Sequence, residues 1–314
     1  MIPALVLTAG LATRLRPLSL VRAKGALPVA GVPLARRILS WLRAAGVTDA
    51  VLNLHHLPET LTALIGDGRD LGMRVRYSWE VPVLGSAGGP KRAAPLLGAP
   101  SFLIVNGDTL TNVDVGALVD AHQRSGAAVT LAAIPNREPD KYSGLAVDDS
   151  GSVTGVVRKG STQPSLHFVG VQVAQAGAFD GAPADTPYES LSALYPTLWK
   201  ARPGAVRAHI TDAEFFDIGT PADYLDTSVA LAAREGRALS AGARTHVDPS
   251  ARLEGTILWD DVVVEAGAML RDCIVTDGAR IPADTSWHGV TIRVARGELA
   301  ATERRINGLA IAAL

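Results

Sequence analysis

Apolar and polar positions in the first half of the chain alternate between two periods. Short apolar or alternating runs, typical of strands, are followed by stretches with apolar residues at helical spacing. Gly46 and Pro58 add a helix stop and a helix start. Strands that take turns with helices predict a mostly parallel α/β sheet covered by helices. The predicted strands are 4–8, 50–54, 73–79, 102–105 and 129–134, and the predicted helices are 34–45, 58–65, 90–97 and 114–125.

The pattern changes after Tyr142. Short strands separated by turns predict an antiparallel insertion rather than another strand–helix–strand unit. Further helices are expected at 188–200 and 221–234, with a short strand at 215–218 between them. The strands of the insertion are 145–147, 153–157 and 168–173.

Beyond a boundary at 236–243, apolar residues recur every six positions, which is typical of a parallel β-helix. The two series are Val247, Leu253 and Trp259, and Val262, Ala268 and Ile274. They do not join in one register and leave room for about two coils, so an irregular β-rich tail remains an alternative. The final stretch, 298–314, is compatible with a helix.

Composition narrows the function classes. The chain has 314 residues and a formal net charge of −1, so it carries no overall basic field for nucleic acid. The single cysteine, Cys273, forms no internal disulfide and fits a reducing compartment. We find no signal-peptide pattern and no apolar run long enough for a membrane span. These features predict a cytoplasmic protein with no nucleic-acid and no membrane partner.

The loop after the first strand is the strongest candidate for chemistry. Its small residues leave backbone N–H groups accessible, which suits a polyphosphate. Arg14 and Lys24 add positive charge beside it. Asp108 follows the strand 102–105, at the carboxyl end where open α/β sheets place ligands. These residues together indicate a nucleoside triphosphate site.

Four segments in order resemble the sugar-1-phosphate nucleotidylyltransferases, most closely the mannose-1-phosphate guanylyltransferase type. They are the loop 7–18, Lys24-Gly25-Ala26-Leu27-Pro28-Val29, Asn106-Gly107-Asp108 and Asp217-Ile218-Gly219-Thr220. The resemblance implies a Rossmann-like, GT-A-like sheet flanked by helices, with a short C-terminal left-handed parallel β-helix. It also implies a catalytic domain at 1–236, the β-helix at 243–288 and a tail at 289–314.

The implied reaction joins a nucleoside triphosphate to a sugar 1-phosphate, and releases pyrophosphate. GTP is favoured over UTP, the sugar is of mannose or heptose type, and Mg²⁺ is the cofactor. The resemblance assigns catalysis to Arg14 and Lys24, and metal binding to Asp108 and Asp217. Nucleotide binding falls to Leu7, Ala9, Gly10, Leu11, Ala12, Thr13, Glu80, Gly85, Ser86, Asn106 and Gly107, and sugar-phosphate binding to Gly144, Lys159 and Gly170. In this interpretation 80–89 is a glycine-rich loop that reads the base.

The chain departs from the family pattern at several positions. Ala12 replaces a glycine, which we expect to be tolerated if its φ is negative. Ala23 replaces a proline, and Arg158 and Gly160 replace a glutamate and a proline. Arginine cannot accept hydrogen bonds from sugar hydroxyls, so the sugar could bear an extra anionic group.

Alternatives stay open. They include uridylyl transfer to an unusual sugar phosphate, and a regulatory relative that binds nucleotide sugars without turnover. A dinucleotide-binding oxidoreductase needs an acidic residue that 28–35 lacks. A metal-dependent glycosyltransferase needs a second carboxylate beside Asp108. The end of the β-helix would be an open edge, from which we expect a homo-oligomer.

Overall fold

The computed structural model describes residues 1–237, 240–297 and 299–314. Its contacts separate two compact units. The first unit comprises Met1–Gly10 and Arg37–Phe216, and the second comprises Leu11–Arg36 and Asp217–Leu314. Each is described by itself below. The domain limits expected from the sequence stay a prediction.

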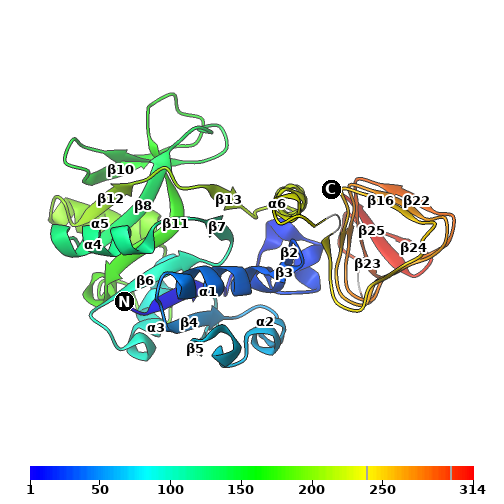
Figure 1. The fold of residues 1–314 in the computed structure, drawn as a ribbon. Helices are drawn as coiled ribbons and strands as arrows, with labels where there is room; N and C mark the ends of the chain where they lie inside the picture. The colour runs from blue at the N-terminus through cyan, green and yellow to red at the C-terminus, as the bar shows by residue number, and fades with distance from the viewer. Residues whose placement is uncertain (238–239, 298) are drawn as a thin grey trace. The chain divides into compact units, whose positions relative to one another are not determined.

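A nine-stranded sheet forms the centre of the first unit (Figure 1). Strands β5, β4, β1 and β6 lie side by side in parallel, β11 runs against β6 and β8, and β12 pairs in parallel with β8. Their bounds are β1 (Ala4–Leu7), β4 (Asp49–Leu54), β5 (Arg74–Trp79), β6 (Ser101–Asn106), β8 (Val129–Pro135), β11 (Leu166–Gln175) and β12 (Val206–Ile210). The predicted mostly parallel α/β sheet is therefore confirmed, although the sequence analysis missed β12.

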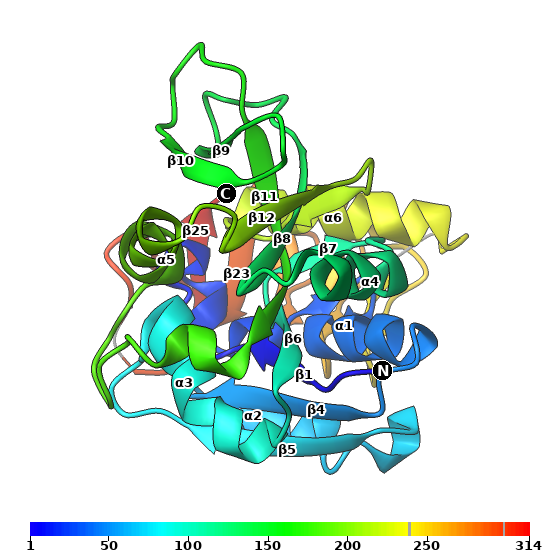
Figure 2. The same ribbon diagram turned by 90° about the vertical axis from the view of Figure 1, so that its left-hand side faces the viewer.

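The antiparallel insertion is also present. Strands β9 (Gly144–Val147) and β10 (Val153–Val157) pair with each other, and Leu145 pairs with Leu166 at the start of β11. They extend the sheet beyond that end of β11 (Figure 2). A separate two-stranded sheet joins β7 (Thr109–Thr111) and β13 (Phe215–Asp217).

Helix α4 begins at a capping residue that is visible in the sequence. Asp114 accepts a hydrogen bond from the N–H of Ala117 (2.9 Å) and thereby starts α4. The helices of the first unit are α2 (Pro58–Ile65), α3 (Gly85–Leu97), α4 (Val115–Ser125) and α5 (Tyr195–Ala201), with short turns η4 (Arg69–Leu71), η5 (Ala176–Phe179) and η6 (Ser190–Leu194). Helix α1 (Leu34–Ala44) begins in the second unit and continues into the first.

Helix α3 corrects the expected loop 80–89. The predicted helix 90–97 begins five residues earlier, at Gly85. Two prolines inside the helix and a run of glycines are poor helix formers, so local propensity concealed it. Tertiary contacts stabilise its first turn, where Ala87 donates its N–H to the carbonyl of Tyr188 (2.9 Å).

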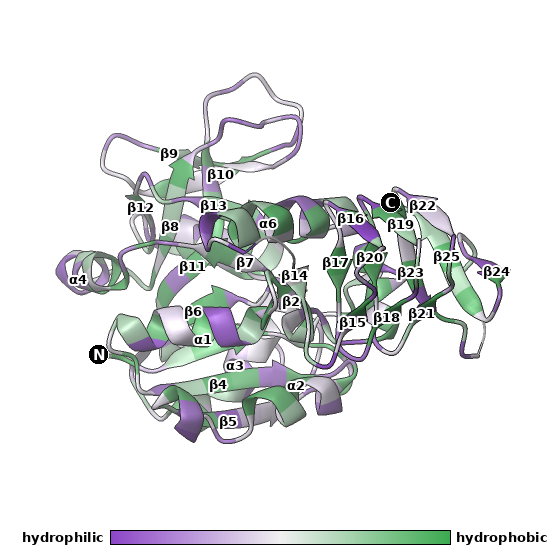
Figure 3. Cartoon of the chain, turned by 45° about the vertical axis from the view of Figure 1, so that its right-hand side comes forward, coloured by the Kyte–Doolittle hydropathy of each residue, from purple (hydrophilic) through white to green (hydrophobic). Residues whose placement is uncertain are grey.

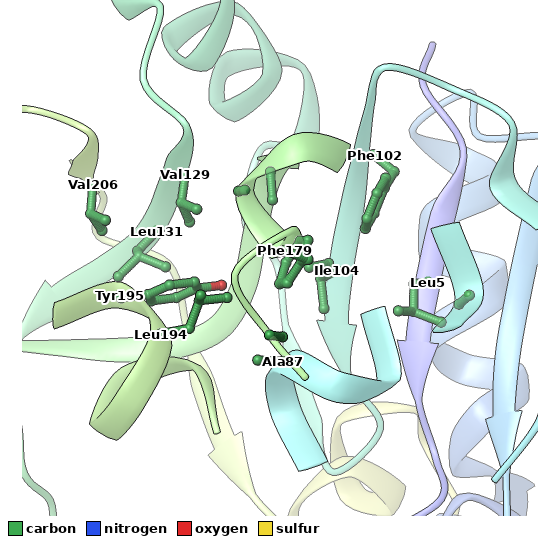
Figure 4. Close-up of a cluster of buried hydrophobic side chains, with 14 of the residues drawn as sticks. Leu5, Ala87, Phe102, Ile104, Val129, Leu131, Phe179, Leu194, Tyr195 and Val206 are labelled. Atoms are coloured by element: carbon green, nitrogen blue, oxygen red, sulfur yellow. The ribbon is translucent and has the colours of Figure 1, made fainter. Parts of the chain in front are cut away.

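The core of the first unit lies between the sheet and helices α3 and α5 (Figure 4). The rings of Phe102 and Phe179 stack with centroids 5.9 Å apart. Tyr195 is fully buried and donates its hydroxyl hydrogen to Gln172 Oε1 (2.7 Å). The other labelled residues of the cluster are Leu5, Ala87, Ile104, Val129, Leu131, Leu194 and Val206.

The second unit begins with the loop that follows β1. It contains the turns η1 (Thr13–Leu15), η2 (Leu18–Leu20) and η3 (Lys24–Ala26) and the hairpin β2 (Pro28–Val29) and β3 (Val32–Pro33). Helix α6 (Pro221–Arg234) matches its predicted bounds, because Thr220 and Asp223 form a capping box at its start.

Ten short parallel strands follow and build coils (Figure 1). Each strand from β14 to β20 pairs in parallel with the strand seventeen residues later. The strands are β14 (Ser240–Ala241), β15 (His246–Val247), β16 (Arg252–Glu254), β17 (Ile257–Leu258), β18 (Val263–Val264), β19 (Met269–Arg271), β20 (Ile274–Val275), β21 (Arg280–Ile281), β22 (Ser286–His288) and β23 (Val290–Val294). Figure 3 shows apolar residues along β17 and β20.

The parallel β-helix prediction is confirmed, but the expectation of about two coils is wrong. The described strands form three coils, β14–β16, β17–β19 and β20–β22, and β23 continues the stack. One coil contains seventeen residues, which is one fewer than three sides of six. One side of each coil therefore has only five residues, and this shorter step explains why the two apolar series with a period of six do not join. The alternative of an irregular tail is excluded by the regular pairing.

The helix considered for 298–314 is wrong for its described residues. Strands β24 (Arg304–Ile306) and β25 (Leu309–Ala313) form a hairpin instead, and β25 pairs antiparallel with β23. Asn307 (φ 50°) and Gly308 (φ 80°) make the tight turn, and Asn-Gly is a strong hairpin signal. The outer edge of β23 is thus covered, which removes part of the argument for an oligomer.

Among the described residues, no helix combines the length and the apolar character that crossing a bilayer requires.

Candidate active site

The loop that leaves β1 is fixed by a side chain from β4. Asn53 Oδ1 accepts the N–H groups of Thr8 (2.5 Å) and Ala9 (3.2 Å), and the Thr8 hydroxyl donates to the Asn53 carbonyl. Leu7, Ala9 and Gly10, predicted to bind nucleotide, all lie at this end of β1. Asn53 therefore positions the loop, and sequence reasoning missed it. An asparagine within the apolar strand 50–54 was the available signal.

Glu80 and Ser86 are already engaged by the chain itself. Glu80 is fully buried, and its carboxylate accepts from Asn53 Nδ2 (2.7 Å) and from the N–H of Leu84 (2.8 Å). The Ser86 hydroxyl donates to Glu189 Oε2 (2.5 Å). The predicted nucleotide contacts of Glu80, Gly85 and Ser86 stay predictions. In the structure, the Glu80 carboxylate links Asn53 to the start of α3 through these two hydrogen bonds.

The segment Asn106-Gly107-Asp108 lies where β6 ends, next to β1. Gly107 donates its N–H to the Leu7 carbonyl (2.9 Å), and a Cβ at Gly107 would collide with that carbonyl. Only glycine therefore allows the two strand ends to approach so closely. Asp108 is half-buried and follows at the carboxyl end of the sheet.

The residues predicted to bind sugar phosphate lie around β9, β10 and β11. Gly170 has φ +77°, and a Cβ there would lie 2.9 Å from Thr109 Oγ1. It coincides with the register shift in the pairing of β11 with β8. Gly144 opens β9, and Lys159 is exposed after β10, as is Arg158.

An aromatic cluster that the sequence analysis did not single out lies in the same region. The His167 ring has its centroid 4.4 Å from that of Tyr142 and 4.6 Å from that of Phe215. Burial lowers the pKa of His167, so its imidazole is neutral at physiological pH. Tyr142, His167 and Phe215 are far apart in the sequence, so nothing in the sequence predicted that their rings pack together.

The second unit contains the charged end of the phosphate loop. Arg14 and Thr13 are exposed, and Lys24 is half-buried at the start of η3. A Cβ on Gly219 would lie 3.0 Å from Asp217 Oδ2 and 3.3 Å from Arg14 Nη1. The structure therefore brings Arg14 and Asp217, which are far apart in the sequence, close to the same glycine. Thr220 caps α6, so that role does not fall to Asp217.

Ala12 corrects an expectation. It takes φ 48° and ψ 45°, which is the left-handed region and not the negative φ that would make alanine easy to accommodate. An alanine there costs about 1 kcal/mol relative to glycine. The exposed Leu11 precedes it.

The predicted site residues thus fall in both units. The first unit holds Leu7, Ala9, Gly10, Glu80, Gly85, Ser86, Asn106, Gly107, Asp108, Gly144, Lys159 and Gly170. The second unit holds Leu11, Ala12, Thr13, Arg14, Lys24 and Asp217.

The donor set favours a hard cation. Among residues 1–237, 240–297 and 299–314, no three His, Cys, Asp or Glu side chains gather as a metal cage. Mg²⁺ needs only one or two carboxylates, because it keeps waters and substrate phosphates as its other ligands. Asp108 of the first unit and Asp217 of the second are each a half-buried carboxylate, which is the type of ligand that Mg²⁺ takes.

Residues 3–234 match the family described as nucleotidyl transferase. The chain belongs to this family. The resemblance seen in the sequence is therefore confirmed, and so is the prediction of an enzyme of the nucleotidyltransferase type.

Two relatives illustrate the breadth of the nucleotidyl transferase family. The chain is 29% identical over 297 residues to mannose-1-phosphate guanylyltransferase of Mycobacterium tuberculosis, covering 86% of this chain and 83% of that one. It is 34% identical over 223 residues to N-acetylmuramate alpha-1-phosphate uridylyltransferase of Neisseria meningitidis, covering 69% of this chain and 93% of the relative.

Among solved structures, HddC from Yersinia pseudotuberculosis in complex with GMP-PN has the same fold. The TM-score is 0.65 and the sequence identity is 23%. The match covers 74% of this chain and 100% of the HddC chain.

Proposed function

We propose that this protein transfers a nucleotidyl group from a nucleoside triphosphate to a sugar 1-phosphate and releases pyrophosphate. GTP is the favoured nucleotide, and the sugar is of the mannose or heptose type. The observation that carries the proposal is the family match over 3–234, which spans the anchored loop after β1 and both of its cations. The guanylyltransferase relative supports the choice of base.

Each group of residues has a part in this proposal. The backbone of 9–13 binds the triphosphate, and Arg14 holds the phosphates that depart, because a guanidinium offers a planar fork to phosphate oxygens. Lys24 shields the α-phosphate and the attacking sugar phosphate from mutual repulsion. Gly144, Lys159 and Gly170 bind the sugar phosphate.

Asp108 and Asp217 hold Mg²⁺ in this proposal. When bound, Mg²⁺ neutralises charge on the phosphates. No side chain is needed as a general base, because the sugar phosphate oxygen that attacks is already anionic.

A second candidate is uridylyl transfer to an acidic sugar phosphate. Arg158 stands where the family resemblance leads us to expect a glutamate, and it is exposed beside Lys159. The Neisseria relative acts on N-acetylmuramate 1-phosphate, whose sugar carries a carboxylate. An arginine at this position suits a carboxylate and disfavours neutral hydroxyls that need an acceptor.

The direct test is a matrix of five nucleoside triphosphates against a panel of neutral and acidic sugar 1-phosphates, read by pyrophosphate release with Mg²⁺. Turnover of GTP with mannose 1-phosphate supports the first proposal. Turnover confined to UTP and an acidic sugar supports the second. Binding of nucleotide sugars without turnover of any pair would contradict both and indicate the regulatory alternative. A cytoplasmic location and a homo-oligomer remain part of the proposal, to be tested by cell fractionation and by light scattering.

Asp108→Asn tests the metal assignment. We expect Mg²⁺-dependent turnover to be abolished while circular dichroism stays unchanged. Asp114→Asn is the matched control, because asparagine caps α4 as well as aspartate does. An Asp108→Asn enzyme with the rate of the control would exclude the carboxylate as a metal ligand.

Lys24→Ala tests the shielding role. We expect kcat to fall by far more than triphosphate affinity, because the charge acts mainly when the two anions approach. Lys200→Ala, at an exposed position in the last turn of α5, is the control. Equal losses in kcat and in affinity would reduce Lys24 to a binding residue.

A further inference from the structure

One arginine ties the loop of Lys24 to two coils of the β-helix. Arg22 donates from Nε to Asp277 Oδ2 (2.7 Å) and from Nη2 to Asp277 Oδ1 (2.6 Å) and Asp260 Oδ2 (2.6 Å). Asp260 and Asp277 occupy equivalent places in consecutive coils, since they are seventeen residues apart. The Arg22 side chain is only 11% exposed, and its guanidinium lies 5.3 Å from the ring centre of Trp259.

Further bonds hold the same loop a few residues later. Tyr224 of α6 donates its hydroxyl hydrogen to the Pro28 carbonyl (2.7 Å) and accepts one from Trp259 Nε1 (2.8 Å). Arg237 donates to the Ala30 carbonyl. All these residues belong to the second unit. The segment 22–30 is therefore attached at three points, to the β-helix, to α6 and to Arg237, which follows α6.

Lys24 lies between the first two of these points. It starts η3, and its carbonyl accepts the N–H of Leu27 (3.1 Å). Only Ala23 separates it from Arg22, so little conformational freedom remains between the anchor and the lysine. Ala23 has replaced the proline that the family resemblance leads us to expect, which removes one local constraint on φ.

Stability alone is a weak explanation for the buried charges. Exchanging a buried ion pair for packed apolar residues is often neutral or favourable, because desolvation offsets the attraction. Burial works to lower the pKa of Arg22, but its bonds to Asp277 and Asp260 outweigh burial and raise it, so the guanidinium stays charged. A bidentate, charge-assisted contact fixes direction as well as distance, and direction is what a catalytic loop needs.

We propose that Arg22, Asp260 and Asp277 are positioning residues for Lys24, so that the β-helix sets the place of this lysine during nucleotidyl transfer. The proposal rests on the proposed function, because it takes Lys24 to be the residue that shields the reacting phosphates. It assigns the β-helix a part in the reaction rather than in stability alone.

The test compares wild type, the double variant Asp260→Asn/Asp277→Asn, Arg22→Lys and the control Asp261→Asn. Asp261 lies in the same coil region and forms a two-bond ion pair with Arg244 (2.6 and 2.7 Å), but that pair is exposed, and its carboxylate bonds to Arg244 rather than to Arg22. Two readouts are used on the full chain, namely steady-state kinetics and amide hydrogen exchange followed peptide by peptide.

We expect the double variant to lose kcat by about ten- to hundredfold, with KM for the triphosphate within about threefold of wild type, because misplacement affects chemistry more than binding. Exchange over 22–30 should rise at least about tenfold, while β4 and β6 stay protected. Arg22→Lys cannot bond both carboxylates at once and should show a smaller loss of the same kind. Adding Arg22→Met to the double variant should change kcat by less than about twofold, since the contact is already gone.

The proposal is overturned if the double variant keeps wild-type kcat and exchange, if KM rises as much as kcat falls, or if Asp261→Asn behaves alike. Should the double variant not fold, Arg22→Lys decides by the same criteria. If wild type transfers no nucleotide to any sugar phosphate, the proposed function fails, and unchanged exchange over 22–30 in the variants would separately refute the anchoring.

Discussion

Replacing the buried Tyr224 by phenylalanine tests the second attachment point of the loop. The Tyr224→Phe change keeps the aromatic ring and removes only the hydroxyl, which makes two hydrogen bonds. The indole N–H of Trp259 and the carbonyl of Pro28 then lose their buried partner. Each such group costs about 1–3 kcal/mol, so we expect the two together to cost about 2–6 kcal/mol. Burial raises the pKa of Tyr224 far above its usual value, so the phenol is neutral and no charge is lost.

The control is Tyr195→Phe in the first unit. Tyr195 is equally buried, and its hydroxyl donates a hydrogen bond to Gln172 Oε1 (2.7 Å). We expect a loss of about 1–3 kcal/mol there, because one buried group loses its partner. Native-state hydrogen exchange gives the free energy of opening for each unit, from peptides of α6 for one variant and of β11 for the other.

The outcome that refutes this reasoning is a Tyr224→Phe loss no larger than that of Tyr195→Phe. The two bonds at Tyr224 would then contribute no more than one bond elsewhere. Faster exchange at 28–30 is expected only for Tyr224→Phe.

Three further predictions concern stability. Burial pushes the pKa of Glu303 upward, but bonds from Arg293 and from the N–H of Ala300 outweigh it and hold the pKa below its usual 4.5. The stability that this pair contributes is therefore present above pH 4.5 and lost as the pH falls through the lowered pKa. Glu303→Gln should cost about 3 kcal/mol at pH 7, and thermal melts of variant and wild type should converge in acid. Ala12→Gly should relieve left-handed strain and stabilise by up to about 1 kcal/mol in urea unfolding; a lower stability would mean that the flexible unfolded glycine dominates. Thr220→Ala should destabilise α6 by about 1 kcal/mol, visible as faster exchange at its first turn and absent in Thr220→Ser.

Local signals decided which elements the sequence could predict. Helices α2 and α6 match their predicted bounds, because Pro58 and the pair Thr220-Pro221 mark their starts. Helix α3 was shortened in prediction, because its glycines and prolines act against helix locally and its first turn depends on contacts with Tyr188. The hairpin β24–β25 has a local signal in Asn307-Gly308, although the sequence analysis interpreted 298–314 as compatible with a helix.

The candidate site divides in the same way. Residues of contiguous motifs, such as Gly107 and Arg14, could be found from their order along the chain. Asn53 and Arg22 could not be found in this way, because their hydrogen-bond partners are distant in the sequence. Asn53 bonds to Glu80, 27 residues away, and Arg22 bonds to Asp277, 255 residues away. The φ of Ala12 also depends on the folded loop, so the sequence indicated only the condition under which an alanine is tolerated and not whether it is met.

The hairpin formed by β24 and β25 gives the stacked coils a built-in terminus. Because β25 runs antiparallel to β23, it presents the wrong polarity for another coil to add in register. Lengthening by a whole turn of seventeen residues upstream of Val290 would leave every lateral neighbour unchanged, whereas truncation after Val294 would expose a template for end-to-end polymerisation. The β-helix can thus change its length in steps of seventeen residues during evolution, while the hairpin keeps the edge of β23 covered and prevents end-to-end association there.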